Sequence, residues 1–203
     1  MEISEQIASK AYELYMTYGV HSVTMDNIAY KLGISKKTIY CHFKSKNAMV
    51  ETIITQKIEK NRAQLDAHKD NLNDALELLM ANLKTICNFF RSLSPNVLFD
   101  LEKYHPLAFN TLTDYINGFL YKIIENDILR GIKQGVFREN VDLYIIIHFL
   151  LKNLQTIFSM DIHQHLIFSQ QKPEVELLNH FLNGIATPKT REYAHGLPYI
   201  LKV

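Results

Sequence analysis

The sequence has few cysteines and no long apolar run. Its two cysteines, Cys41 and Cys87, are too few for a disulfide scaffold. The longest strongly apolar stretch, residues 143–151, is shorter than the roughly 20 residues that a membrane span needs. Glu2 and Glu5 interrupt the N-terminus, so no secretory signal is recognisable. We therefore expect a cytoplasmic protein with reduced cysteines and no membrane partner.

Low-complexity tracts and catalytic motifs are also missing. Apolar residues make up 47% and charged residues 21% of the 203 positions, a balance that is typical of globular proteins rather than disordered ones. No Gly-rich phosphate loop, HExxH zinc pattern or nucleophile elbow is present. Because the Asp, Glu and His residues form no spaced constellation, we expect neither an enzyme nor a cofactor.

Acidic residues are absent from one segment near the N-terminus. The net charge of +1 gives no indication of nucleic acid for the chain as a whole. Residues 27–50 nevertheless contain no Asp or Glu, and their five lysines are Lys31, Lys36, Lys37, Lys44 and Lys46. Such a local asymmetry is typical of a nucleic-acid-binding surface, although a run of lysines can also be a solvated face.

Helical periodicity predicts an all-α fold. Apolar residues from Ile7 to Tyr18 share one face of a first helix that Gly19 ends. Thr24 is a candidate N-cap for a second short helix, which Gly33 ends. Longer helices are expected over residues 46–70, 72–92, 95–105, 106–134, 143–163 and 173–186, followed by an irregular tail over 188–203. A break of the helix over 106–134 is expected near Gly118 or Gly131. Ile145 to Ile147 would also suit a buried strand, but the length of their segment favours a helix.

The pattern predicts about nine helices in two functional parts. Residues 1–46 are expected to form a three-helix N-terminal domain, and residues 47–203 a second, larger helical domain. We expect no flexible linker between them, because the long helix that begins at Lys46 joins both parts.

Two short helices joined by a tight turn with glycine make a helix-turn-helix. Its second helix, expected from about Ser35 to Phe43, enters the major groove of DNA. Ile39 and Phe43 lie four residues apart and so share the buried face. The candidate DNA contacts are Thr24, Ser35, Lys36, Lys37, Thr38, Tyr40, His42 and Lys46.

These candidates differ in the contact that their chemistry favours. Lysine binds guanine O6 or N7, or neutralises phosphate, whereas Tyr40 and His42 suit phosphate better. Alternatively, Tyr40 packs its ring and His42 is a plain surface histidine. Cys41 is expected to be a small exposed residue, and we expect no metal at Cys41 and His42, because adjacent helical residues point in different directions.

The residues named above resemble the DNA-binding domain of the TetR family. The segment from Val23 to Ser35 is similar to its first half, and the segment from Ser35 to Lys46 to its recognition helix and the start of the fourth helix. Asn27 departs from the family, which more often has an acidic or another polar residue there, and weakens a capping box at Thr24. The positions that match the family pattern are Ser35, Ile39, Tyr40, His42, Phe43 and Lys46.

The resemblance implies a homodimeric transcription regulator, usually a repressor, that binds a palindromic operator in double-stranded DNA. It also implies a variable C-terminal domain for a small effector and a four-helix dimer interface built from two C-terminal helices of each subunit. The segment 131–138 resembles the turn before the first of these helices. The resulting hypothesis is a repressor that a small, mostly apolar effector releases from DNA. The alternative is a helical adaptor that binds a protein through the same surface.

Apolar residues on the last two long helices are the candidates for the dimer interface. Residues 143–158 are apolar on more than one face, so the helix must be covered on several sides. The alternative is the core of a monomer. The candidate interface residues are Ile146, Leu150, Leu154, Phe158, Leu178, Phe181, Leu182 and Ile185.

Aromatic residues concentrate between positions 89 and 119, and ligand sites are mostly apolar with a few polar groups. The candidate effector-pocket residues are Phe89, Phe90, Phe99, Tyr104, Phe109, Tyr115 and Phe119. Such a stripe is also what an ordinary helical core would contain. Asp161, His163 and His165 are expected to be surface residues near a helix end rather than a metal site.

Overall fold

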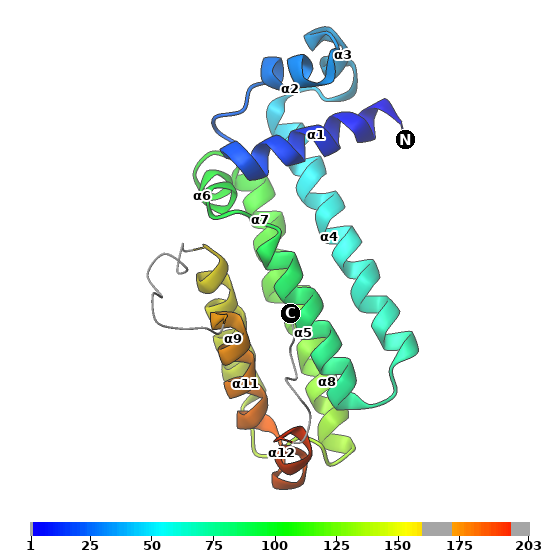
Figure 1. Cartoon of the computed structure of the whole chain (residues 1–203), viewed down its shortest axis with the longest axis vertical. Coiled ribbons are helices and arrows are strands. Elements are labelled where there is room, and N and C mark those ends of the chain that lie inside the picture. Colours follow the sequence, from blue (N-terminus) through cyan, green and yellow to red (C-terminus); the bar gives the residue numbers. More distant parts are fainter. Residues whose placement is uncertain (1, 160–171, 196–203) are drawn as a thin grey trace. The chain divides into compact units, whose positions relative to one another are not determined.

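The computed structural model describes residues 2–159 and 172–195, which form helices and no strand (Figure 1). The expected all-α fold is therefore confirmed. The chain divides into two compact units, Met1–Lys60 with Leu93–Asp114 and Asn61–Ser92 with Tyr115–Val203. None of the described helices combines the length and the apolar character that a membrane crossing requires.

The first unit contains the three short helices that the sequence predicts at the N-terminus. Buried Ile7, Tyr15, Ile28, Ile39 and Met49 form its core, and α1 packs on α2, α3 and α6. Its elements are α1 (Ile3–Tyr18), α2 (Met25–Leu32), α3 (Lys36–His42), the first part of α4 (Lys46–Asn71), α6 (Pro95–Tyr104) and α7 (Pro106–Asp114).

Helix caps fix the ends of α2. The Thr24 hydroxyl accepts a hydrogen bond from the Asn27 N–H (3.1 Å), and the Thr24 N–H donates to the Asn27 amide oxygen (2.8 Å). The prediction that Asn27 weakens this capping box is wrong, because its amide oxygen takes the place of the usual Glu or Gln oxygen. Gly33 ends the helix in the left-handed conformation, with φ 66°.

The second unit contains the rest of α4 and the helices around a larger core. Helix α5 packs against α8 and α9, and α9 also packs against α8 and α11. Besides α4, its elements are α5 (Ala75–Arg91), the π-helix η1 (Tyr115–Leu120), α8 (Tyr121–Lys133), α9 (Leu143–Ser159), α11 (Pro173–Ile185) and α12 (Pro188–His195).

The helical stretch predicted over 106–134 is interrupted at one of its two glycines. The π-helix η1 contains Gly118, whereas Gly131 lies inside α8. There a Cβ atom would lie 2.1 Å from the Phe137 ring, so this glycine permits a close approach rather than a break.

Other expected boundaries need correction or lie outside the described residues. The prediction of an irregular tail is wrong over 188–195, where the chain forms α12. This helix begins with Pro188, and the hydroxyl of the preceding residue, Thr187, accepts a hydrogen bond from the Thr190 N–H. The predicted end of the helix over 143–163 lies outside the described residues. Helix α4 begins at Lys46 as predicted, and the division into functional parts 1–46 and 47–203 stays a prediction.

Candidate nucleic-acid interface

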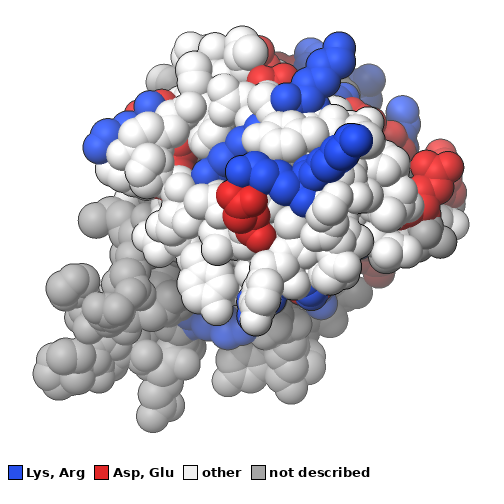
Figure 2. Space-filling view, turned by 90° about the horizontal axis from the view of Figure 1, so that it is seen from above, with Lys and Arg blue, Asp and Glu red and all other residues white. Residues whose placement is uncertain are grey.

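Helix α3 is anchored by one buried face and presents the other to solvent. Ile39 and Phe43 are 0% and 6% exposed, as the sequence predicts. Lys37, Tyr40 and His42 are exposed on the remaining surface. Figure 2 looks down onto α2 and α3 and shows Lys and Arg side chains projecting from this face, with acidic side chains between some of them.

Several of the candidate contacts already take part in local hydrogen bonds. The Ser35 hydroxyl accepts from the Thr38 N–H at 3.0 Å and lies 2.8 Å from the Thr38 hydroxyl. Thr24 is engaged in the cap of α2 described above. These hydroxyls therefore act first as helix caps, which leaves the exposed N–H groups of each first turn to face an anion.

Lys36 forms an ion pair with an acidic residue of α2. Its ammonium nitrogen lies 2.7 Å from the Asp26 carboxylate, and the hydrogen bond to Asp26 raises the pKa of Lys36. Both side chains are largely exposed. Such surface pairs contribute little net stability, so a phosphate can compete with Asp26 for Lys36.

Lys46 has a different environment from the other lysines. It is half-buried, and its ammonium group donates to the His21 carbonyl at 3.2 Å. Burial lowers the pKa of Lys46, and the nearby Asp100 carboxylate opposes this effect. Unlike Lys37, Lys46 is therefore occupied within the first unit.

A helix remote in sequence contacts the loop that leads into α2. The Asp100 carboxylate of α6 accepts a hydrogen bond from the His21 N–H at 2.7 Å. The Tyr104 ring stacks on the His21 imidazole, with ring centroids 4.2 Å apart. Sequence reasoning did not find Asp100, and it assigned Tyr104 to the effector pocket, because neither residue belongs to a local motif.

The seven aromatic residues predicted for the effector pocket do not form one cluster within a unit. Phe99, Tyr104 and Phe109 belong to the first unit, and Phe99 is 58% exposed. In the second unit Phe89 contacts both Phe90 and Tyr115, and Tyr115 stacks on Phe119. The assignment of these residues to a pocket stays a prediction.

The second aromatic group also carries polar side chains. The Tyr115 hydroxyl donates to the Asn61 amide oxygen at 2.6 Å, and the Arg62 guanidinium lies 4.1 Å from the Phe119 ring centroid. Tyr115 and Asn61 are both buried. A mixed aromatic and polar interior of this kind is suited to recognising a small organic molecule.

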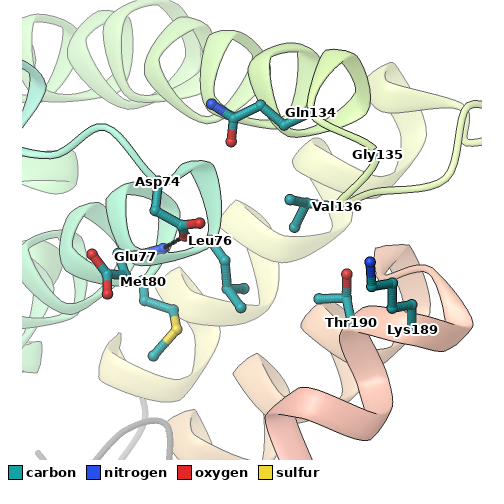
Figure 3. Close-up of a pocket in the computed structure, with 9 residues that line it drawn as sticks. All are labelled: Asp74, Leu76, Glu77, Met80, Gln134, Gly135, Val136, Lys189 and Thr190. Atoms are coloured by element: carbon teal, nitrogen blue, oxygen red, sulfur yellow. Dashed lines mark hydrogen bonds between the residues drawn. The ribbon is translucent and has the colours of Figure 1, made fainter.

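A cavity of about 490 Å³ lies elsewhere in the second unit (Figure 3). Leu76 and Val136 point into the space between α5, the turn that follows α8, and α12. Glu77 and Lys189 add opposite charges to its wall. None of the predicted aromatic residues lines this cavity. Its lining residues are Asp74, Leu76, Glu77, Met80, Gln134, Gly135, Val136, Lys189 and Thr190.

Seven of the eight residues predicted for the dimer interface are buried within the chain itself, and their assignment to an interface stays a prediction. Their side chains are at most 8% exposed because α9 and α11 pack within the second unit. Ile146 is half-buried. The buried seven are Leu150, Leu154, Phe158, Leu178, Phe181, Leu182 and Ile185.

The apolar surface of α9 lies on another side of the helix. Tyr144, Ile145 and Phe149 are 67%, 63% and 58% exposed. His148 and Tyr121 contact Tyr144 and extend this surface. Sequence periodicity indicated that α9 is apolar on several faces, and only the structure distinguishes the inner face from the outer one.

Metal ligands do not gather among residues 2–159 and 172–195, where no three His, Cys, Asp or Glu side chains are placed to share an ion. Cys41 is exposed and Cys87 buried, and both are free thiols. Asp161, His163 and His165 lie outside the described residues.

Comparison with known proteins supports the assignment of the N-terminal helices. Residues 7–53 match the model of the "Bacterial regulatory proteins, tetR family". An uncharacterised HTH-type transcriptional regulator of Bacillus subtilis, YvaF, is 23% identical over 184 residues, which cover 90% of this chain and 95% of that protein.

Solved structures show the same fold over most of the chain. The TetR-family regulator PfmR of Thermus thermophilus has a TM-score of 0.67 and 19% identity, with 88% of this chain and 97% of PfmR covered. A putative transcriptional regulator of Saccharomonospora viridis, solved in complex with choline, has a TM-score of 0.70 and 21% identity, with 91% and 97% covered. Residues 7–53 thus match the DNA-binding domain of the TetR family, and the chain shares the fold of regulators of that family.

Proposed function

We propose that the protein is a ligand-responsive repressor that binds a palindromic operator as a homodimer. The observation that carries this proposal is the exposed face of α3. Lys37, Tyr40 and His42 project from a helix that Ile39 and Phe43 anchor in the core, within a segment that lacks acidic residues. A helix held in this way can enter the major groove without losing its packing.

The exposed residues take different parts in the proposed complex. Lys37 lies beside the bases or neutralises a phosphate, and Lys36 exchanges Asp26 for a phosphate. Tyr40 and His42 donate hydrogen bonds to the DNA backbone. The capped first turns at Thr24 and at Ser35 with Thr38 direct their N–H groups to phosphates.

The outer face of α9 is the proposed dimer surface. Tyr144, Ile145 and Phe149 place three large apolar side chains on adjacent turns in solvent, and a second copy of the same helix would cover them. A two-fold dimer presents two α3 helices to half-sites about 34–36 Å apart or a multiple of this spacing, which a palindromic operator supplies.

The second unit is the proposed effector-binding part. Its cavity of about 490 Å³ lies within the usual size range of small-molecule sites, and apolar side chains with a few polar groups line it. The Saccharomonospora viridis neighbour holds choline, which supports a small organic effector. An effector that binds the released state more tightly lowers DNA affinity, and DNA lowers effector affinity by the same factor.

The proposal is tested with a duplex that the wild-type protein selects from a random-sequence library. Lys37→Ala and Tyr40→Ala should each weaken binding of this duplex by about tenfold, the effect of one or two lost contacts. Lys69→Ala, at an exposed position of α4 outside the DNA-binding domain, is the matched control and should bind as the wild type does. A folded wild-type protein that selects no duplex would contradict DNA binding and favour the adaptor.

A ligand screen tests the effector part of the proposal. Choline is the first compound to test, because a structural neighbour was solved with it. A compound that raises the melting temperature should also weaken binding of the selected duplex. Ligands that bind tightly and leave DNA affinity unchanged would contradict the allosteric scheme.

A further inference from the structure

The loop between α1 and α2 is held at His21 from three sides. The N–H of His21 donates to the Asp100 carboxylate at 2.7 Å, and the carbonyl of His21 accepts from the Lys46 ammonium group at 3.2 Å. The Tyr104 ring stacks on the His21 imidazole. We call these four residues, His21, Lys46, Asp100 and Tyr104, the His21 clamp.

In the clamp, two oppositely charged side chains, those of Asp100 and Lys46, bind the backbone N–H and carbonyl of His21. Asp100 is 8% exposed and Lys46 is half-buried. Hydrogen bonds between backbone groups and charged side chains are stronger than those between neutral groups, and partial burial reduces the competition from water. His21 itself is exposed, so its position depends on these contacts rather than on burial in the core.

Gly19 makes the approach of Asp100 possible. A Cβ atom at this position would lie 2.8 Å from the same carboxylate oxygen that accepts from His21. The φ of Gly19 is 80°, a conformation that other residues rarely adopt. The glycine that ends α1 therefore also admits the side chain that holds the following loop.

The loop determines how the helix-turn-helix leaves α1. Only Ser22 and Val23 lie between His21 and Thr24, the N-cap of α2, and α2 packs on α3. A displacement of His21 by an ångström would change the position of α2 and with it that of α3. Base contacts depend on such positions. A change in the clamp should therefore change the affinity for a specific DNA sequence.

We propose that Lys46, Asp100 and Tyr104 are positioning residues for DNA binding, and that Lys46 uses its ammonium group to hold His21 rather than to neutralise a phosphate. This proposal rests on the proposed DNA-binding function. It assigns to α6 a part in setting the position of α3, and it gives Lys46 a role that differs from the DNA contact predicted from the sequence.

The salt dependence of binding distinguishes the two roles of Lys46. Each lost phosphate contact reduces the slope of log affinity against log salt by about 0.9. Lys46→Met should weaken binding of the selected duplex by about tenfold with an unchanged slope, whereas Lys36→Met, the matched control, should reduce the slope because Lys36 is the proposed phosphate ligand. A reduced slope for Lys46→Met, equal to that of the control, would overturn the assignment of Lys46.

A pair of substitutions at Tyr104 tests positioning against general packing. Tyr104→Phe keeps the ring that stacks on His21, so this variant should bind the selected duplex with the affinity of the wild type. Tyr104→Leu keeps apolar volume without the ring and should lose about tenfold, while binding to poly(dI-dC) at low salt, which needs no exact register, stays within about twofold. Equal affinities of the Leu and Phe variants for the selected duplex would contradict the proposal.

Hydrogen exchange separates failure of the clamp from failure of the proposed function. Asp100→Ala should accelerate exchange of the His21 amide by at least about tenfold, because the variant lacks the acceptor. An unchanged exchange rate would refute the clamp whether or not the protein binds DNA. If Asp100→Ala does not fold, Asp100→Leu, which keeps about the size of the side chain but has no acceptor, serves in its place. A wild-type protein that selects no duplex would instead contradict the proposed function.

Discussion

The N–H of His21 donates a hydrogen bond to the carboxylate of Asp100, a residue 79 positions later in the chain, over 2.7 Å. This contact joins α6 to the loop before α2 within the first unit. The carboxylate can approach because Gly19 has no side chain. One glycine therefore supports both the end of α1 and a contact between distant parts of the sequence.

Gly19→Ala should destabilise the protein by more than backbone strain alone would. The conformation at Gly19, with φ 80° and ψ 157°, costs other residues on the order of 1–3 kcal/mol, and the new Cβ would also displace Asp100. The matched control is Gly19→Ala in an Asp100→Ala background, where the backbone strain at position 19 is the same but the carboxylate that the new Cβ would meet is gone. Urea denaturation should show a larger loss for Gly19→Ala in the wild-type background, and equal losses would contradict the role of Asp100.

The capping box of α2 should contribute measurably to the stability of the first unit. Thr24→Ala removes the acceptor for the Asn27 N–H and should lower the free energy of unfolding by about 0.5–2 kcal/mol. Thr24→Ser keeps the hydroxyl and should restore most of this loss. A Ser variant as unstable as the Ala variant in urea denaturation would show that the methyl group, rather than the cap, matters.

Asp127 should make the protein more stable at low pH than at neutral pH. Burial raises the pKa of Asp127 from 3.8 to about 6, although a hydrogen bond from the Asn82 amide opposes the shift. Since the folded state then binds the proton more tightly than the unfolded state, this group's contribution to stability falls as pH rises from about 4 through 6. The difference corresponds to about 3 kcal/mol at most.

Asp127→Asn should remove this penalty. Its free energy of unfolding should exceed that of the wild type at pH 7–8 and show no gain at pH 4, as measured by chemical denaturation across this range. Asp114→Asn, at an exposed carboxyl group, is the control and should leave the pH dependence unchanged. A wild-type stability that stays flat between pH 4 and 6 would refute the assignment.

The outer face of α9 should determine the oligomeric state. Phe149→Glu places a charge among Tyr144 and Ile145 and should raise the dimer dissociation constant by roughly 30-fold or more, the effect of losing an interface residue worth about 2 kcal/mol. Leu150→Ala is the contrasting variant, because Leu150 is fully buried in the chain. It should lower the melting temperature instead, by creating a cavity. Sedimentation velocity that shows Phe149→Glu still dimeric would exclude this face.

Local signals allowed much of the DNA-binding domain to be predicted. Gly33 and Ser35 mark helix ends by their own backbone and side-chain chemistry, and the spacing of Ile39 and Phe43 identifies the buried face of α3. Each of these features depends on residues within a few positions of one another. The Asp100 and His21 contact has no such signal, because its two residues are brought together only by the packing of α6 on α1.

The C-terminal helices show a second limit of sequence reasoning. Periodicity identified α9 as apolar on more than one face, yet Leu150 and Phe149 are adjacent and have opposite environments, one buried and one exposed. Hydrophobicity alone does not distinguish a face that packs within the chain from one that a partner covers. Helix α12 was missed although Pro188 is a good first residue for a helix, because the tail around it has little apolar periodicity.

The π-helix η1 has a consequence for how this chain is compared with its relatives. A π-turn accommodates one residue more than an α-helical turn, so removing one residue from Tyr115–Leu120 would restore a regular α-helical turn and leave the direction of the following side chains unchanged. The face of α8 that buries Ile124 and Ile128 would stay on the core, whereas a deletion within α8 itself would rotate the residues after it by about 100°. An alignment that places a relative without this extra residue against η1 must open its gap there, or every position of α8 is paired with the wrong neighbour.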